Sequence, residues 1–184
     1  MEKTIQDVLQ DGGYILYARH GEATVGVDQP YLHFQYCSTQ KNLSEVGRSE
    51  AIYYGQLLRY WQIPVSMPII ASPFCRTIET AQLAFPYANI LVDPFFVGIY
   101  KLGEPISNAE QTTIITNLQS VLEMKPPQGT NKVIIAHSFP EGIGLGEISN
   151  MGSVMIKPRG QGNGYEVVRK LTLQDVANLG SIKL

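Results

Sequence analysis

Short apolar runs and longer amphipathic stretches alternate along most of this chain. The runs are rich in aliphatic, aromatic and β-branched residues and stop at turn-forming residues, a pattern typical of strands. Six runs predict strands, at residues 14–18, 68–71, 90–92, 132–136, 153–156 and 165–170. The last two alternate apolar and polar positions, so we expect antiparallel or edge strands there.

Amphipathic helices are predicted between these runs. Ser44 is suited to cap a helix that carries an apolar stripe at helical spacing and ends before Pro64. Residues 76–83 are compatible with a helix after the second strand. Residues 107–110 have the sequence of a capping box and open a helix with one apolar face, and a short amphipathic turn follows at residues 173–179.

The order of these elements indicates the fold class. Strands that alternate with helices form a mainly parallel sheet covered on both faces. For a chain of 184 residues we expect an α/β fold, a three-layer α/β/α sandwich with a mainly parallel sheet and an antiparallel edge strand. We expect a single domain over residues 1–184, with irregular excursions at about residues 23–42 and 93–107 that roof one edge of the sheet.

Composition excludes two classes of partner. The chain has 14 Lys and Arg against 16 Asp and Glu, so its net charge of −2 lacks the basic character of a nucleic-acid-binding protein. No apolar run approaches the ~20 residues that a membrane span needs. We therefore expect neither a nucleic acid nor a membrane as a partner.

The cysteines and the N-terminal residues point to a reducing compartment. Cys37 and Cys75 are far apart and do not form a Cys-x-x-Cys spacing, so we expect neither a disulfide framework nor a thiolate metal site. The first residues are polar and of mixed charge, without the apolar segment of a signal peptide. We expect a cytoplasmic protein.

Four chemically active side chains follow the ends of predicted strands. Arg19 and His20 end the first strand. Arg76 follows the second strand within one helical turn, and His137 ends the strand at residues 132–136. Because the carboxyl ends of parallel strands share one edge, where ligands bind, all four should converge there.

Two guanidinium groups and two imidazoles, with few carboxylates beside them, form a site suited to a dianion, above all to a phosphoryl group. A neutral His can attack phosphorus through one ring nitrogen while the other keeps its proton on a backbone acceptor. The remaining groups would bind the equatorial oxygens, so this chemistry needs no metal and no cofactor. Two plainer interpretations stay open: Arg76 could pair with Glu79 or Glu45, and His33 is better explained as a solvated loop residue than as a ligand.

Longer motifs around these residues carry a family resemblance. Residues 19–22 read Arg-His-Gly-Glu after an apolar strand, residues 43–51 fit a helix start of the form Leu-Ser-x-x-Gly, and residues 72–80 fit Ser-Pro-x-x-Arg-Thr-x-Glu-Thr. With His137 after its strand, this combination resembles the histidine phosphatase superfamily, which includes the cofactor-dependent phosphoglycerate mutases. The resemblance spans about residues 14–170.

The resemblance implies an enzyme and assigns roles to its residues. His20 would be the nucleophile, and Glu22 and Ser138 would lie at substrate-binding positions. The phosphate pocket would be formed by Arg19, Arg76 and His137. The implied activity is metal-independent hydrolysis of a phosphomonoester, on a small molecule or a phosphoprotein, through a phosphohistidine. Aromatic side chains in the two excursions favour an apolar or aromatic leaving group.

The usual proton donor of these enzymes is missing. Phosphatases of this superfamily have an Asp-x-x-Leu-x-Glu-Ile segment, and Gly98 stands at the position of its Glu. Ser138 stands where another branch has an Asp. Glu141 is the candidate for a substitute general acid, with Glu22 next. The alternative function is a non-catalytic module that binds phosphate or a phosphorylated ligand and has lost the acid.

Overall fold

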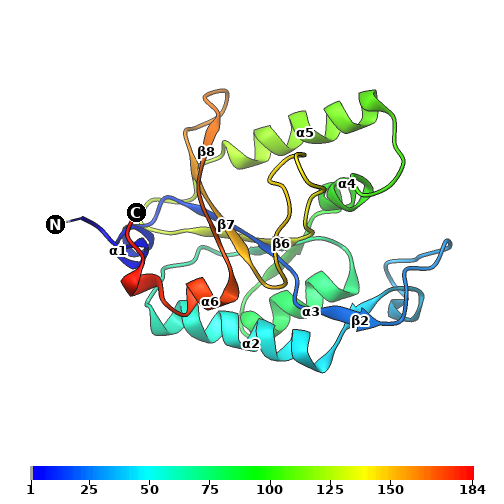
Figure 1. Ribbon diagram of the computed structural model, residues 1–184, viewed down its shortest axis with the longest axis horizontal. Helices are drawn as coiled ribbons and strands as arrows, with labels where there is room; N and C mark the ends of the chain where they lie inside the picture. Colours follow the sequence, from blue (N-terminus) through cyan, green and yellow to red (C-terminus); the bar gives the residue numbers. More distant parts are fainter. Residues whose placement is uncertain (1) are drawn as a thin grey trace.

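The computed structural model describes residues 2–184 and is built around a six-stranded sheet (Figure 1). In spatial order the strands are β5 (Ile90–Val92), β4 (Ile69–Ala71), β6 (Lys132–Ala136), β1 (Ile15–Arg19), β7 (Ser153–Pro158) and β8 (Tyr165–Leu171). The first four are parallel to one another, and β7 is antiparallel to both β1 and β8. The predicted mainly parallel sheet with an antiparallel pairing at its β8 edge is confirmed.

Helices cover both faces of this sheet, as the alternating pattern predicted (Figure 1). One face packs against α1 (Ile5–Asp11), α2 (Glu45–Tyr60), α3 (Cys75–Ala84) and α6 (Leu173–Val176). The other packs against α4 (Val97–Lys101) and α5 (Asn108–Leu122). Strand β1 divides its side chains between the two cores, because neighbouring residues of a strand point to opposite faces: Leu16 enters the first core and Tyr17 the second.

The helix starts show where local sequence reasoning succeeded and where it failed. Ser44 caps α2 as predicted, accepting a hydrogen bond from the Gly47 amide. Ser107 caps α5, although Glu110 does not return the second bond of a capping box. The structure instead has a complete capping box at Thr4, which opens the short helix α1 that the sequence pattern did not predict.

The excursion at residues 23–42 has more order than its sequence indicated. It begins with β2 (Ala23–Val25), which pairs with β3 (Asn42–Leu43), and contains the 3-10 turn Cys37–Thr39. The second excursion contains the 3-10 turn Pro94–Phe96 followed by α4. A last 3-10 turn, Leu179–Ser181, precedes the C-terminus.

The cysteine prediction was wrong. Cys37 and Cys75 form a disulfide that joins the first excursion to the first residue of α3. The two cysteines are 38 residues apart, so no local spacing signals the pair. The cross-link holds the loop between β2 and β3 against the start of α3, directly before Arg76.

We expect reduction of this disulfide to lower the free energy of unfolding by roughly 2–4 kcal/mol, because the cross-link restricts the unfolded chain. Urea unfolding with and without dithiothreitol measures the difference. The double variant Cys37→Ser, Cys75→Ser is the control and should be insensitive to the reductant. Two titratable thiols in the untreated protein, with no response to reductant, would contradict this expectation.

Two features of residues 2–184 concern membrane insertion and metal binding. Among residues 2–184, no helix is long and apolar enough to cross a membrane. The same residues contain no group of three or more His, Cys, Asp or Glu side chains that could hold a metal ion.

Candidate active site

The register of the sheet brings three strand ends together. Arg19 is paired with Ala136 across β1 and β6, and Ala71 with Ile135 across β4 and β6. The residues that follow these strands therefore lie side by side at the carboxyl edge. The rings of His20 and His137 meet there edge to face, with centroids 5.7 Å apart.

The turn after β1 lies directly on the start of α2, and two glycines permit this contact. A Cβ atom at Gly21 would lie 2.3 Å from the carbonyl oxygen of Gly47, and one at Gly47 would lie 2.0 Å from the Glu22 oxygen. Both positions therefore require glycine for steric reasons. This close approach explains why the two motifs at residues 19–22 and 43–51 occur together.

His20 is held in one tautomer. Its backbone amide donates to the Ala136 oxygen at 3.1 Å, and its Nδ1 lies 2.7 Å from the Gly21 carbonyl oxygen. Because a carbonyl oxygen can only accept, Nδ1 carries the proton and Nε2 keeps a free lone pair. Burial, reinforced by the Arg76 guanidinium, lowers the pKa of His20 to about 3. The imidazole is therefore neutral at physiological pH.

This buried neutral His20 should make the protein less stable in acid. The unfolded chain takes up a proton at His20 near pH 6.5, whereas the folded protein does so only near its pKa of about 3. Between these values the unfolded state binds more protons, so the free energy of unfolding falls as pH falls. From pH 7 to 5 the loss at this site is about 2 kcal/mol.

Urea unfolding of the unaltered protein and of His20→Asn at pH 7 and pH 5 measures this effect. The variant should lose about 2 kcal/mol less than the unaltered protein over the same interval. Titrating groups that do not interact with His20 are common to both proteins and cancel in the comparison, whereas His137, whose pKa His20 lowers, contributes a further difference. Equal losses in the two proteins would contradict the assignment.

His137 is fixed by three neighbours. Its Nε2 lies 2.8 Å from the Oγ of Ser72, and the Tyr17 hydroxyl donates to its backbone oxygen at 2.9 Å. The Phe74 ring packs edge to face against the imidazole, with centroids 4.7 Å apart. Burial, the nearby His20 and two guanidinium groups hold the pKa of His137 well below its ordinary value. A second neutral imidazole thus faces the first.

Arg76 faces the site and does not pair with the helix carboxylates. Its Nη1 and Nη2 donate to the two carboxylate oxygens of Asp28 at 2.9 and 3.2 Å, and Nη1 also donates to the Lys41 oxygen at 3.0 Å. Its guanidinium lies 4.4 Å from the centre of the Phe74 ring. The proposed pairing with Glu79 or Glu45 is wrong. Both carboxylates bind Arg48 instead.

Arg19 anchors a neighbouring loop through Nη1, and its buried Nε makes no hydrogen bond within residues 2–184. Its Nη1 donates to the Ile148 oxygen at 2.9 Å, and the Ile148 amide donates to the Ser138 hydroxyl at 2.8 Å. Ser138 therefore braces the loop before β7. The Nε of Arg19 is buried and has no hydrogen-bond partner among residues 2–184. A buried unpaired donor is costly, and an anion bound beside it would relieve that cost.

The two carboxylates predicted as substitute acids have different surroundings. Glu22 accepts a hydrogen bond from the Ser44 hydroxyl at 2.8 Å, and its amide donates to Glu50, so it ties the turn after β1 to α2. Glu141 is exposed. His33 lies in the first excursion, where its ring packs on Tyr36.

Three contributors to the site were missed by sequence reasoning. Ser72 and Thr80 belong to the motif at residues 72–80, and that motif could have signalled them: Ser72 contacts His137, and the Thr80 hydroxyl accepts from the Gly21 amide at 3.2 Å. Asp28 has no such signal, because it lies in a loop without periodicity. Its hydrogen bond with Tyr100, at 3.2 Å, links the two excursions.

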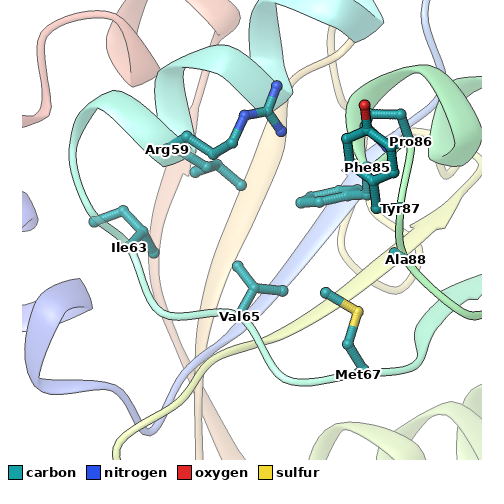
Figure 2. Close-up of a pocket in the computed structure, with 9 residues that line it drawn as sticks. Arg59, Ile63, Val65, Met67, Phe85, Pro86, Tyr87 and Ala88 are labelled. Atoms are coloured by element: carbon teal, nitrogen blue, oxygen red, sulfur yellow. The ribbon is translucent and has the colours of Figure 1, made fainter.

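A separate cavity of about 370 Å³ lies elsewhere in the fold (Figure 2). Apolar residues that precede β4 and β5, among them Val65, Met67 and Phe85, form most of its wall, so it lies toward the amino ends of these strands. Arg59 is its one charged lining residue, and its Nη1 donates to the Ala84 oxygen at 2.8 Å. The groups suited to phosphoryl chemistry lie at the opposite edge.

Comparison with known proteins identifies the fold. Neither protein-family models nor curated protein sequences match this chain. Solved structures do match, at low sequence identity. A phosphoserine phosphatase from Entamoeba histolytica, in complex with 3-phosphoglyceric acid, is 16% identical with a TM-score of 0.60, and the match covers 89% of this chain and 98% of that one.

Two further matches are similar in extent. The protein histidine phosphatase SixA, complexed with tungstate, is 13% identical with a TM-score of 0.53, covering 89% of this chain and 99% of that one. The mycobacterial glucosyl-3-phosphoglycerate phosphatase, in complex with VO3, is 15% identical with a TM-score of 0.52, covering 79% and 91%. The chain therefore shares the fold of these three phosphatases, as the resemblance of its motifs implied.

Proposed function

We propose that this protein is a phosphatase that hydrolyses a phosphomonoester through a phosphohistidine at His20. The observation that carries this proposal is the tautomer of His20, whose Nδ1 proton is held by the Gly21 oxygen. A neutral imidazole with a free Nε2, beside two guanidinium groups, is suited to attack phosphorus. The fold shared with known phosphatases supports the same activity.

The pocket around His20 is suited to the charge that develops on a transferring phosphoryl group. Arg76 and Arg19 are fixed by protein partners, and the Nε of Arg19 still has a proton to donate. His137 can present Nδ1–H when the Ser72 hydroxyl donates to its Nε2. Donors that are already oriented stabilise the transition state without reorganising during the reaction.

The walls of the site favour a leaving group with an apolar or aromatic part. Phe34 is 38% exposed and Tyr100 is partly exposed, and both pack on the buried Phe74 ring, with centroids 5.2 and 4.6 Å from it. We propose a phosphorylated small molecule or phosphoprotein as the substrate class. The matched structures include a phosphoserine phosphatase, a protein histidine phosphatase and a glucosyl-3-phosphoglycerate phosphatase.

A panel of phosphorylated compounds tests the function. It contains aryl and alkyl phosphates, phosphoserine and a phosphohistidine peptide, each assayed for phosphate release with the unaltered protein and with His20→Ala. We expect turnover of at least one class that depends on His20. Tight binding of phosphate with no turnover of any compound would favour the alternative, a non-catalytic module for phosphorylated ligands.

We further propose that the reaction is independent of metal ions, because the positive charge that phosphoryl oxygens require comes from Arg19 and Arg76. Activity measured with and without EDTA should agree within about two-fold. Activity that is lost in EDTA and restored by one divalent ion would contradict this expectation.

The cytoplasmic location expected from the sequence can be tested through the oxidation state of the two cysteines in cells. Disulfides are rare in the reducing cytoplasm, so the Cys37–Cys75 pair removes the cysteine argument for the cytoplasmic location expected from the sequence. Alkylation of free thiols in cells before lysis, followed by mass spectrometry, separates the two cases. Two alkylated cysteines would support the cytoplasmic location.

A further inference from the structure

Asp28 is the carboxylate that the fold places against the proposed phosphoryl-binding arginine. It lies in the loop after β2, where Arg76 binds both of its oxygens. The Lys41 amide donates to Oδ1 at 2.9 Å, and the Tyr100 hydroxyl donates to Oδ2 at 3.2 Å. The side chains of Asp28 and Arg76 are only 17% and 5% exposed. Partners from three segments thus fix this carboxylate.

The position of Asp28 brings it into contact with any group that Arg76 binds. Phosphoryl oxygens bind guanidinium nitrogens at about 2.8 Å. The Asp28 oxygens already lie 2.9 and 3.2 Å from the same nitrogens, so a phosphoryl group held by Arg76 has this carboxyl as its neighbour. Tyr100 connects it to the catalytic cluster, because its ring lies 5.7 Å from that of His137.

We propose that Asp28 is the general acid of the phosphoryl transfer, in the role left open by Gly98. This inference rests on the phosphatase function proposed above. A Cβ atom at Gly98 would lie 3.3 Å from the Ile114 side chain, so this position faces the α5 packing. The residue of α4 that does reach the site is Tyr100, and it binds Asp28. The acid therefore comes from a different loop.

Substrate binding raises the proton affinity of Asp28, which then takes the proton for this role from solvent water. Burial alone would raise the pKa of Asp28, but hydrogen bonds from Arg76 and the Lys41 amide outweigh it and keep the pKa below its ordinary value. A phosphoryl dianion on Arg76 takes the cation away from the carboxylate and adds a negative charge beside it. Both changes favour the protonated acid. Asp28 is therefore ionised in the free enzyme and protonated beside the substrate.

The proposed reaction has two steps, phosphorylation of His20 and hydrolysis of the phosphohistidine. In the first, the Nε2 lone pair of His20 forms a bond to phosphorus, the bond from phosphorus to the leaving oxygen breaks, and Asp28 gives its proton to that oxygen. In the second, the Asp28 carboxylate takes a proton from water, the water oxygen binds phosphorus, and the bond to Nε2 breaks. Phosphate leaves, and the Asp28 proton is restored.

The test is the dependence of phosphorylation rate on the leaving group. Single-turnover release of alcohol or phenol is measured for p-nitrophenyl phosphate, phenyl phosphate and an alkyl phosphate. In Asp28→Asn the rate with the alkyl ester should fall by roughly 100-fold or more relative to the rate with p-nitrophenyl phosphate. Asp28→Glu, which keeps an acid, should retain the shallow dependence of the unaltered protein.

Two carboxylates serve as matched controls. Glu104→Gln removes a negative charge that acts on Tyr100, and Glu141→Gln removes the acid first predicted from the sequence. Both should leave the leaving-group dependence as it is. Loss of the shallow dependence in Glu141→Gln but not in Asp28→Asn would overturn the proposal.

Other outcomes also decide the question. If the rate with all three esters fell equally in folded Asp28→Asn, Asp28 would have a role that does not involve proton transfer to the leaving group. If the rate rose with all three esters and inorganic phosphate bound more tightly, Asp28 would only compete with the phosphoryl group for Arg76. Either result overturns the proposal while leaving a functional phosphatase. Absence of phosphohistidine in the unaltered protein would instead refute the phosphatase function itself.

Discussion

His20→Ala is expected to abolish turnover, with a fall of at least roughly 1,000-fold in kcat with every phosphomonoester that the protein hydrolyses. The reason is that Nε2 of His20 is the one nucleophile in the proposed mechanism, and its orientation depends on the bond from Nδ1 to the Gly21 oxygen. The unaltered protein should carry a phosphoryl label on His20 after rapid quench from a labelled aryl phosphate. That label should survive base and be lost in acid.

Peptide mapping and His20→Asn complete this experiment. Asn has an amide of similar bulk that cannot form a stable phosphoramidate under these conditions, so it separates loss of the nucleophile from loss of packing. Circular dichroism shows whether each variant is folded. Label on a Ser or Asp, or label kept by folded His20→Ala, would refute the assignment.

Local sequence pattern was sufficient to predict the sheet and the residues at its carboxyl edge. The apolar runs that end at His20 and His137 are long enough to be recognised as strands, and the alternation with helices makes them parallel. Parallel register then brings the two imidazoles together without any knowledge of the loops. Gly21 and Gly47 belong to motifs that were recognised in the sequence. The structure shows why both are glycine, because a Cβ atom at either position would clash with the backbone opposite.

The contacts that escaped prediction connect segments far apart in the sequence. Asp28 and Arg76 are 48 residues apart, and the cysteines of the disulfide 38. Each pairing depends on how the loop between β2 and β3 folds over α3, and neither residue type nor spacing encodes that path. The sequence therefore could not single out Asp28, and the candidate acid predicted from it is Glu141, which is close to His137 along the chain.

The short helix α1 escaped for a different reason. It has only seven residues, too few to show a convincing apolar period. Its start is nevertheless encoded locally, since Thr4 and Asp7 exchange both bonds of a capping box. The capping residues Thr4 and Asp7 therefore indicate helix α1 better than the composition of this segment, which shows only that it is polar.

Arg76→Ala is expected to lower kcat/KM by at least roughly 100-fold, the loss typical of removing one oriented donor from a transition state. Arg76→Lys should recover only part of it, because an ammonium group cannot donate to two oxygens in the planar arrangement of a guanidinium group. The same change leaves the Asp28 carboxylate without its cation, so activity must be expressed per folded protein.

Arg48→Ala is the matched control, because it removes an arginine that pairs with Glu79 and Glu45 but makes no contact with the histidines. It should keep activity within about three-fold of the unaltered protein, since partly exposed ion pairs contribute little to stability. Binding of inorganic phosphate supplies a second measurement and should weaken in Arg76→Ala and not in Arg48→Ala. If folded Arg76→Ala kept full specific activity and phosphate affinity, Arg76 would be a structural partner of Asp28, and the phosphoryl pocket would have to be built from Arg19 and the two imidazoles alone.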